Sequence, residues 1–296
     1  MDAPILVTGL RKTYGSRAAV DGIDLRIERG EVFALLGPNG AGKTTTVEIL
    51  EGFRRRDGGS VNVLGEDPER AGLGWRNRLG IVLQSSTGLD LITPREALAS
   101  TAKVYRTPRD VDEVLAAVGL VDKADDRIGK LSGGQRRRLD VGLGIVGTPE
   151  LLFLDEPTTG FDPQARRDFW ELIGSLADGG TTILLTTHYL DEAEHLADRV
   201  GVIAMGRMLA LDTPANLGGR ASLEATVTWE DDAGTRHTER TSTPTRLVAA
   251  LSARVGGEVP KLTVTRPSLE DTYLALIAPH AVGEPVGADP VAEVVA

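Results

Sequence analysis

The chain has 296 residues, with 43 acidic residues against 33 lysines and arginines, so its formal net charge is −10. This balance argues against a general nucleic-acid binder, which needs a basic surface to neutralise phosphates. No nucleic-acid partner is expected, and the arginine triplets at 54–56 and 136–138 are predicted to lie on solvated helix faces. The sequence has no cysteine, which excludes disulfides, thiolate metal sites and thiol nucleophiles. No apolar run approaches the roughly 18 residues that span a bilayer, and no signal peptide is recognised, so we expect a soluble chain that reaches a membrane only through a partner.

The first third of the chain predicts strands around a single helix. Alternation of apolar and polar residues over 5–30 predicts short antiparallel strands. The continuous apolar run at 32–36 is typical of a strand that is buried on both faces. A glycine-rich turn then leads into a helix over 44–53, and further strands are expected over 58–64 and 79–83.

The middle of the chain alternates helices with buried strands. Apolar spacing predicts a helical region over 93–128, with helix starts near Thr93 and Thr107. Strands that alternate with helices predict an α/β fold with a mostly parallel sheet. The strands are expected over 151–154, 181–187 and 199–211, and the helices over 163–178 and 190–198.

The end of the chain differs in composition from the rest. A polar hairpin, a helix over 244–255 and a last helix opened by the capping pattern of Ser268 and Asp271 predict a small α/β module over 218–277. Residues 278–296 contain no lysine or arginine and are rich in Pro, Gly and Val, so a flexible tail is expected there.

A glycine-rich segment after the 32–36 run fits the phosphate-binding pattern G-x-x-x-x-G-K-[ST]. Glycines let backbone N–H groups surround a phosphate, and the start of the next helix adds partial positive charge. Lys43 can reach the β- and γ-phosphates, and the Thr44 hydroxyl can bind Mg²⁺. A chance glycine-rich turn is the alternative, but the position between a buried strand and a helix favours nucleotide binding. The residues predicted to hold the nucleotide in this segment are Gly37, Pro38, Asn39, Gly40, Ala41, Gly42, Lys43, Thr44 and Thr45.

Two acidic residues follow the predicted strand at 151–154. Asp155 stands at the carboxyl end of this strand, where ligands gather in open α/β sheets, and it can hold Mg²⁺. Glu156 follows directly and can act as the general base that polarises an attacking water. A pair of helix-capping acids is the alternative interpretation. The combination with the upstream Lys43 favours catalysis.

Three more polar side chains are predicted to lie on the phosphate side of the sheet. Gln84 follows the 79–83 strand, and its amide oxygen can join Thr44 and Asp155 as a ligand of Mg²⁺. His188 follows the 181–187 strand and can contact a phosphate or the attacking water. Asp162 lies just after the turn that follows Glu156. Each alone is more simply a cap, but their shared position favours a role near the γ-phosphate.

The segment at 131–135 reads Leu-Ser-Gly-Gly-Gln and precedes a helix predicted to run to about Val146. Ser132, Gly133, Gly134 and Gln135 form a second helix start suited to an anion. Because the first glycine-rich segment already holds the phosphates, this second site needs its own explanation. Two chains that face each other would supply one, each contributing this segment to the nucleotide of the other.

Taken together, these motifs resemble those of the nucleotide-binding subunit of ATP-binding cassette (ABC) transporters. The resemblance extends over residues 4–217. Its most specific part is the LSGGQ segment at 131–135, which lies between the glycine-rich motif at 37–45 and the acidic pair at 155–156. It implies a P-loop NTPase cassette over 1–217, with a mostly parallel sheet core, an antiparallel β subdomain and a helical subdomain over about 85–148.

The family resemblance also implies an assembly and a set of roles. Two copies would form a head-to-tail homodimer that encloses two ATP molecules with Mg²⁺. Tyr14 would stack on adenine, and Ser132 and Gly134 would contact the ATP held by the opposite chain. Glu156, His188 and Lys43 would be the catalytic residues, with Asp162 in the D-loop.

The ending at 266–276 resembles the C-terminal segment of ABC-2-type exporter ATPases, including the daunorubicin/doxorubicin-resistance group. This implies an ATPase at the cytoplasmic side of the cell membrane, held there by a separate ABC-2-type permease and powering export of a drug, an antibiotic or a lipid. The sequence departs from the family pattern at Phe161, where leucine is usual, and in the segment 89–95, which is expected where the permease docks. The alternatives are an importer ATPase, a soluble ABC ATPase acting on ribosomes or DNA, and an inactive regulatory cassette.

Overall fold

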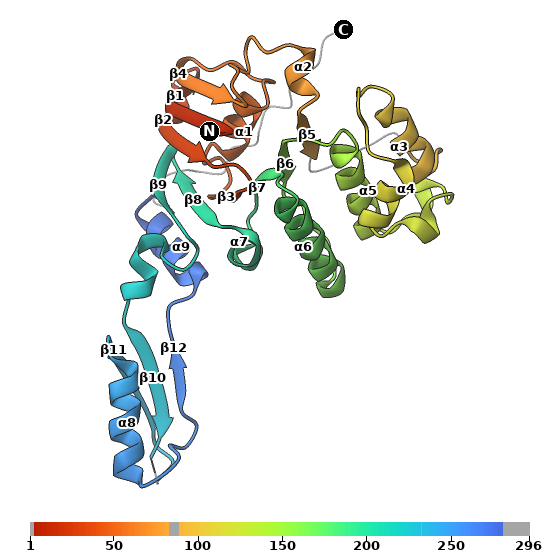
Figure 1. Cartoon of the computed structure of the whole chain (residues 1–296). Helices are drawn as coiled ribbons and strands as arrows, with labels where there is room; N and C mark the ends of the chain where they lie inside the picture. The colour runs from red at the N-terminus through yellow and green to blue at the C-terminus, as the bar shows by residue number, and fades with distance from the viewer. Residues whose placement is uncertain (1–2, 83–88, 232, 281–296) are drawn as a thin grey trace.

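In the computed structural model, which describes residues 3–82, 89–231 and 233–280, a six-stranded sheet forms the centre of the molecule (Figure 1). Its strand order is β5-β6-β7-β3-β8-β9. Neighbours from β5 to β8 pair in parallel, and β9 pairs antiparallel with β8. The strands are β3 (Val32–Leu36), β5 (Leu79–Val82), β6 (Leu151–Asp155), β7 (Thr182–Thr186), β8 (Arg199–Ala204) and β9 (Arg207–Asp212). The mostly parallel sheet predicted from the sequence is confirmed.

The continuous apolar runs explain the middle of this sheet. Every side chain of β3 and β7 is buried, because helices cover one face and a second sheet covers the other. The antiparallel hairpin β8–β9 turns at Met205 and Gly206, which both have positive φ, of 49° and 74°. This is the backbone twist that tight two-residue hairpins favour.

A three-stranded antiparallel sheet packs against the central sheet near its β3 side. Its order is β2-β1-β4, with β1 (Ile5–Tyr14), β2 (Arg17–Ile27) and β4 (Gly58–Val63). Its apolar side chains share one core with Phe33 and Leu35 of β3, with α1 (Lys43–Leu50) and with Trp75 of the short α2 (Leu73–Arg76). This is the antiparallel β subdomain that the sequence predicts.

Helices gather on the other side of β5 and β6 (Figure 1). They are α3 (Pro94–Ala102), α4 (Val111–Ala117) and α5 (Gly133–Ile145), with short 3₁₀ turns η1 (Val121–Lys123) and η2 (Ile128–Lys130). The second helix of this region begins later than predicted from Thr107. Asp110 caps α4, since its Oδ1 accepts hydrogen bonds from the backbone N–H groups of Asp112 and Glu113.

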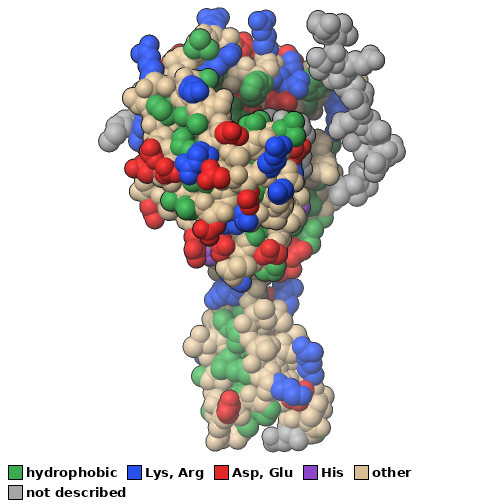
Figure 2. Space-filling view, turned by 90° about the vertical axis from the view of Figure 1, so that its right-hand side faces the viewer, with side chains coloured by type: hydrophobic (Ala, Val, Ile, Leu, Met, Phe, Trp, Pro, Cys, Tyr) green, Lys and Arg blue, Asp and Glu red, His purple; other side chains and the backbone are tan. Residues whose placement is uncertain are grey.

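The C-terminal part forms a narrow lobe that projects from the body (Figures 1 and 2). It contains the sheet β11-β10-β12 and the helix α8, with a small core of its own formed by Val227, Trp229, Leu251 and Val259. The last helix, α9, instead packs back on η3 and α7, and its Leu269 belongs to the core of the body. The remaining elements are α6 (Pro163–Asp178), α7 (Leu190–Leu196), η3 (Leu217–Ser222), β10 (Ala225–Glu230), β11 (Arg236–Thr241), α8 (Pro244–Val255), β12 (Thr263–Thr265), α9 (Leu269–Ile277) and η4 (Ala278–His280).

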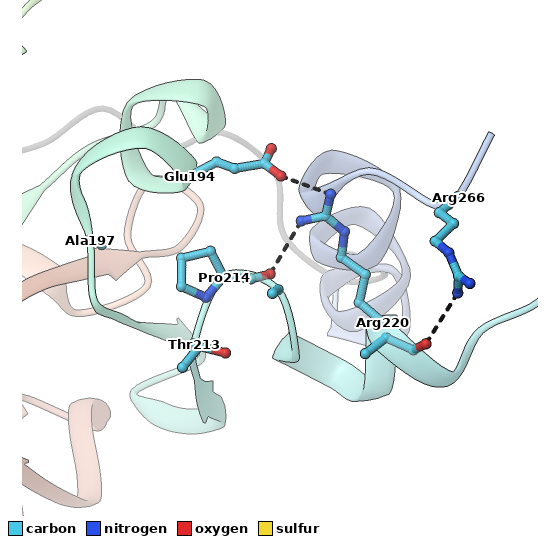
Figure 3. A pocket seen from close by; sticks show the side chains of 8 residues that line it. Glu194, Ala197, Thr213, Pro214, Arg220 and Arg266 are labelled. Carbon is cyan, nitrogen blue, oxygen red and sulfur yellow. Dashed lines mark hydrogen bonds and ion pairs between the residues drawn. The ribbon is translucent and has the colours of Figure 1, made fainter. Parts of the chain in front are cut away.

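Arg220 joins this lobe to the body (Figure 3). Its Nη2 lies 2.7 Å from a carboxylate oxygen of Glu194 on α7, and its Nε and Nη1 donate to the carbonyl oxygens of Pro267 and Pro214 at 2.7 and 3.2 Å. One guanidinium therefore holds together α7, the segment after β9 and the segment before α9. Within the described ranges, no helix is long and apolar enough to cross a bilayer.

Candidate functional site

The carboxyl ends of β6, β7 and β3 lie side by side, because these three strands are neighbours in the sheet. The segment 37–42 follows β3, Asp155 ends β6, and His188 comes two residues after β7 ends. This is the edge where ligands bind in open α/β sheets. The topology thus brings together the three motifs that the sequence places far apart.

The loop between β3 and α1 needs glycine at two points. A Cβ atom at Gly37 would lie 2.3 Å from the carbonyl oxygen of Ile203, and one at Gly42 would lie 2.3 Å from that of Ala19. Gly42 also has a φ of +105° just before α1 begins. The outer residues Pro38, Asn39 and Gly40 are exposed, whereas Ala41 is buried.

Lys43 is buried inside the loop that precedes it. Its Nζ donates to the carbonyl oxygens of Gly37 at 2.6 Å and Pro38 at 3.2 Å. Burial lowers the pKa of Lys43, and the negative charges of Glu156 and Asp155 oppose this shift. Because burial has already removed water from the Lys43 amine, a phosphate has little bound water to displace when it binds there.

The next two threonines occupy the first turn of α1. Thr44 is exposed and Thr45 is half-buried, while the buried Thr46 donates its hydroxyl to the carbonyl oxygen of Gly42 at 2.8 Å. The Thr44 hydroxyl therefore remains on the surface beside the glycine-rich loop.

Asp155 is the last residue of β6 and Glu156 follows it, and the two have different surroundings. The Thr186 hydroxyl on β7 donates to Oδ1 of Asp155, which fixes this carboxylate at the sheet edge. Glu156 has a φ of +43°, an uncommon conformation for a residue with a side chain, and its backbone N–H donates to the carbonyl oxygen of Thr186 at 3.0 Å. Such strained backbone often marks functional positions.

Glu156 and His188 meet across the edge of the sheet. The Nδ1 atom of His188 lies 3.2 Å from Oε1 of Glu156, and the imidazole is half-exposed with its ring against Tyr189. Two groups able to carry a proton thus stand next to each other beside Asp155.

Arg137 is a site residue that the sequence analysis missed. It belongs to the arginine triplet predicted to lie on a solvated face, yet it is only 6% exposed. Its Nη2 donates to the carbonyl oxygen of Asp155 at 2.5 Å and its Nε to that of Pro157 at 3.0 Å, while burial lowers its pKa. The position of Arg137 four residues before the buried Val141, on one face of α5, was the available signal.

Glu192 is a second buried charged residue outside the predicted set. It lies in α7, four residues after His188, and is fully buried. Burial raises its pKa, and the hydroxyls of Thr187 and Thr158 oppose this shift. Thr187 lies just after β7 and Thr158 just after Glu156, so Glu192 lies between these two segments.

The segment at 131–135 forms the start of α5, as predicted. The Ser132 hydroxyl accepts from the backbone N–H of Gln135, and the Gln135 side chain accepts from the backbone N–H of Ser132. Ser132 and Gly133 are exposed, and Gly134 faces Ala165 of α6. Figure 1 shows α5 on the opposite side of β5 and β6 from α1, so this segment and the glycine-rich loop 37–42 of the same chain (the P-loop) are not brought together.

The remaining predicted residues are placed as follows. Asp162 caps α6, since its Oδ1 accepts from two backbone N–H groups at 2.9 Å. Tyr14 ends β1, partly exposed, with the cationic groups of Lys12 and Arg54 at 5.6 and 5.3 Å from its ring centre. Gln84 lies outside the described residues.

The donor set at the sheet edge fits Mg²⁺. This ion prefers hard oxygen ligands and is usually bound by one or two carboxylates together with substrate phosphates. Asp155 and the exposed hydroxyl of Thr44 are such donors. Among the described residues there is no cluster of three or more His, Asp or Glu side chains that would form an all-protein metal cage.

Comparisons with known proteins agree with this geometry. The family model described as ABC transporter matches residues 20–159. The chain is 39% identical over 298 residues to the daunorubicin resistance ATP-binding protein DrrA2 of Streptomyces coeruleorubidus, covering 90% of this chain and 92% of that protein. It is 41% identical over 217 residues to the Nod factor export ATP-binding protein I of Burkholderia orbicola (strain AU 1054), covering 72% and 71%.

Solved structures give the same result. The cbiO1 protein from Clostridium perfringens, described as part of the ABC transporter complex cbiONQ, is similar with a TM-score of 0.67 at 28% identity, covering 73% of this chain and 90% of that one. The chain therefore belongs to the family of ABC transporter ATP-binding proteins. It is an ATPase of the P-loop NTPase fold whose hydrolysis is coupled to transport.

Proposed function

We propose that this chain powers export through a separate membrane permease, as one of two copies that close on ATP. The observation that carries the proposal is the pairing of Glu156 with His188 at 3.2 Å on the same sheet edge as the buried Lys43. Intact groups for phosphate binding and for proton transfer argue against an inactive regulatory cassette.

Different residues at the sheet edge would bind the phosphates and the Mg²⁺. Lys43 would exchange the carbonyl oxygens of Gly37 and Pro38 for the β- and γ-phosphates of ATP, which are better partners for a buried cation. Thr44 and Asp155 would hold Mg²⁺, with Gln84 as a further oxygen donor, and the ion neutralises charge on the phosphates.

Hydrolysis needs a water in line with the γ-phosphate. Glu156 would accept the proton of this water as it attacks, and the γ-phosphoryl group would leave ADP. His188 would hold the Glu156 carboxylate in place and donate to a phosphate oxygen from its other ring nitrogen. Tyr14 would stack on the adenine.

The second copy explains the segment at 131–135. Ser132 and Gly134 lie on an exposed helix start that the P-loop of the same chain does not meet. In a head-to-tail pair, this helix start would face the γ-phosphate held by the other chain, with Asp162 near the contact. ATP would join the two chains, and hydrolysis would release them.

The relatives support the export direction. Their names describe resistance to daunorubicin in Streptomyces and export of Nod factor in Burkholderia. By analogy, this chain would export a drug, an antibiotic or a lipid-like molecule through an ABC-2-type permease, from the cytoplasmic side of the cell membrane. These relatives do not favour the importer, ribosome or DNA alternatives.

Replacement of the general base tests the proposed function. Glu156→Gln keeps the shape of the side chain but cannot accept a proton, so ATP binding should persist while hydrolysis falls at least 100-fold, as expected for loss of a general base. Size-exclusion chromatography with ATP should then show a stable dimer. An E156Q variant that hydrolyses ATP at the wild-type rate would contradict the assignment.

A further inference from the structure

Four buried polar atoms without a hydrogen-bond partner lie together between α6, α7 and the segment that follows Glu156. In the described part of the chain they are both carboxyl oxygens of Glu192, the hydroxyl oxygen of Thr158 and Nε of Arg166. Helices α6 and α7 pack side by side here (Figure 1). Buried polar groups in folded proteins are nearly always hydrogen-bonded, so these atoms indicate hydrogen bonds that form in another state of the protein.

The Glu192 carboxyl has two threonine hydroxyls beside it. Glu192, Thr158 and Thr187 are each fully buried, and we call these three residues the Glu192 cluster. Burial raises the pKa of Glu192, and the two hydroxyls act against this rise, which places them next to the carboxyl. The Thr187 hydroxyl accepts a hydrogen bond from the backbone N–H of Tyr189 at 3.0 Å, but neither hydroxyl is hydrogen-bonded to Glu192. The Glu192 cluster therefore holds matching donors and acceptors that are not joined.

The charged groups around the Glu192 cluster have partners of their own. Nη1 of Arg166 lies 2.9 Å from the carboxylate of Asp191, and its guanidinium covers the ring of Tyr189 at 4.8 Å. Arg137 also lies within electrostatic reach of Glu192, but it donates to backbone carbonyl oxygens. Burial without an ion pair favours the uncharged form of an acid, so these surroundings favour the neutral carboxylic acid.

The Glu192 cluster lies where two catalytic segments meet. Thr158 comes two residues after Glu156, and Thr187 directly precedes His188. Strands β6 and β7 are paired in parallel. In the described ranges, the last backbone hydrogen bond between the two segments runs from the N–H of Glu156 to the carbonyl oxygen of Thr186, at 3.0 Å. Beyond this hydrogen bond, side-chain contacts have to set the position of one segment relative to the other.

We propose that Glu192 is a positioning residue for ATP hydrolysis. Its carboxyl bridges the hydroxyls of Thr158 and Thr187, and this bridge keeps the segment after β6 in register with the segment after β7. A neutral carboxylic acid can both donate and accept a hydrogen bond, so it suits a bridge between two hydroxyls. The inference rests on the proposed function, because it assumes that Glu156 and His188 act together on the attacking water.

The bridge would form when ATP is bound. Hydrogen bonds at catalytic sites are often poorly aligned without substrate and tighten in the complex with it. The groups of the Glu192 cluster are adjacent but not joined, as this behaviour requires. Glu192 would then act on the rate only through the two segments that carry Glu156 and His188.

Glu192→Leu removes the bridge and leaves an apolar side chain of similar size. In the complex of the chain with its permease, kcat should fall at least tenfold, because a displacement of about 1 Å can lower a rate about 100-fold. The Kd of a fluorescent ATP analogue should change less than twofold, since the P-loop and Lys43 are untouched. The melting temperature should not fall, because leucine removes a buried acid that has no partner.

Glu192→Gln is the conservative variant that should restore the rate. An amide also donates and accepts, so kcat should stay within about threefold of the wild type. A residue that only fills space would give the opposite order, with leucine tolerated better than glutamine. The comparison of E192L with E192Q therefore separates positioning from packing.

A double-mutant cycle tests the bridge itself. Thr158→Val removes one hydroxyl and should lower kcat as E192L does, and the double variant should lose no more than either single variant, because both remove the same bridge. T158V also tests the bridge if E192L does not fold. Thr181→Val is the matched control, since Thr181 is a buried threonine just before the opposite end of β7, and its kcat should equal that of the wild type.

The outcomes separate this inference from the proposed function. A kcat of E192L within twofold of the wild type, equal losses in E192L and E192Q, or additive losses for E192L and T158V would each overturn the inference. E156Q is measured in parallel. If E156Q hydrolyses ATP at the wild-type rate, the proposed function fails, whereas an inactive E156Q beside a fully active E192L removes only the role of Glu192.

Discussion

The buried charged side chains of this molecule differ in whether they have hydrogen-bond partners. Lys43 and Arg137 are buried cations, and each donates to backbone carbonyl oxygens beside the sheet edge. Glu51 is a buried acid whose side chain has no hydrogen-bond partner among the described residues. Satisfied buried charges fix the geometry of the nucleotide site, whereas an unsatisfied one weakens the free chain.

The pH dependence of stability should report Glu51 directly. Its pKa is about 8 in the folded chain against an ordinary value of 4.5. Between these two values the folded chain keeps a proton that the unfolded chain releases, so this group lowers the free energy of unfolding as pH rises. A glutamine at this position does not ionise, so it does not lower the free energy of unfolding as pH rises.

Glu51→Gln should therefore stabilise the chain at pH 8 and not at pH 5. The expected gain at pH 8 is about 2 to 4 kcal/mol, or roughly 5 °C or more in melting temperature. Calorimetry of both proteins at the two pH values measures the difference. An equal change in melting temperature at pH 5 and pH 8 would show that ionisation of Glu51 is not the cause.

At the scale of elements, the strands and the motifs at their ends follow directly from the sequence. The apolar runs of β3, β6 and β7 are long enough only for buried strands, and they predict the sheet edge that carries Asp155 and His188. The start of α4 is less predictable, because Thr107 and Asp110 both offer plausible caps and only the backbone hydrogen bonds decide between them. Local pattern alone does not resolve such competition.

Arg137 illustrates what the sequence hides. Three consecutive arginines look alike in sequence, but helical geometry turns Arg137 inward and leaves Arg136 on the surface, where it pairs with Asp90 at 2.8 Å. At the site Arg137 donates to the carbonyl oxygens of Asp155 and Pro157, and backbone acceptors leave no residue-type signal. Its Nη1 also lies 3.9 Å from the carboxylate of Asp140 on the same helix. The role of Thr186 is hidden for a different reason, because its hydroxyl reaches Asp155 only through the pairing of β6 with β7.

Arg137→Met should loosen the contact between α5 and the segment after β6. It leaves the carbonyl oxygens of Asp155 and Pro157 without a donor, so the free energy of unfolding should fall by about 1 to 3 kcal/mol. ATP hydrolysis should fall more than ATP binding, because Asp155 and Glu156 lose their support. Denaturant unfolding and a steady-state ATPase assay measure the two effects.

Arg136→Met is the matched control on the same helix. Its ion pair with Asp90 is exposed, and such pairs contribute about 0.5 kcal/mol, so this variant should behave nearly as the wild type does. If Arg136→Met and Arg137→Met have equal effects, the buried contacts of Arg137 do not position the site.

The whole molecule is a cassette with a lobe held at one junction. The sequence predicts a module over 218–277, and the structure gives the lobe its own core around Trp229 while α9 packs on the body. The origin of this arrangement lies in long-range packing of α9 on η3 and α7, which no local pattern encodes.

Arg220→Met should loosen the junction of α7 with η3 and with the segment before α9. The variant loses an ion pair with Glu194 and hydrogen bonds to two carbonyl oxygens, and charged hydrogen bonds contribute about 1.5 to 3 kcal/mol each. Amide hydrogen exchange in η3 and α9 should then become at least tenfold faster, with ATP binding unchanged. Arg254→Met on the exposed face of α8 is the control, and equal exchange in both variants would remove the junction role.

The central claim is that this cassette hydrolyses ATP for a membrane partner. The most direct measurement is purification of the tagged chain from detergent-solubilised membranes of its own host, followed by mass spectrometry and an ATPase assay of the purified complex. We expect a stoichiometric polytopic partner and an ATPase activity that E156Q abolishes. Recovery of the chain with ribosomal proteins or DNA and without a polytopic partner would contradict the account.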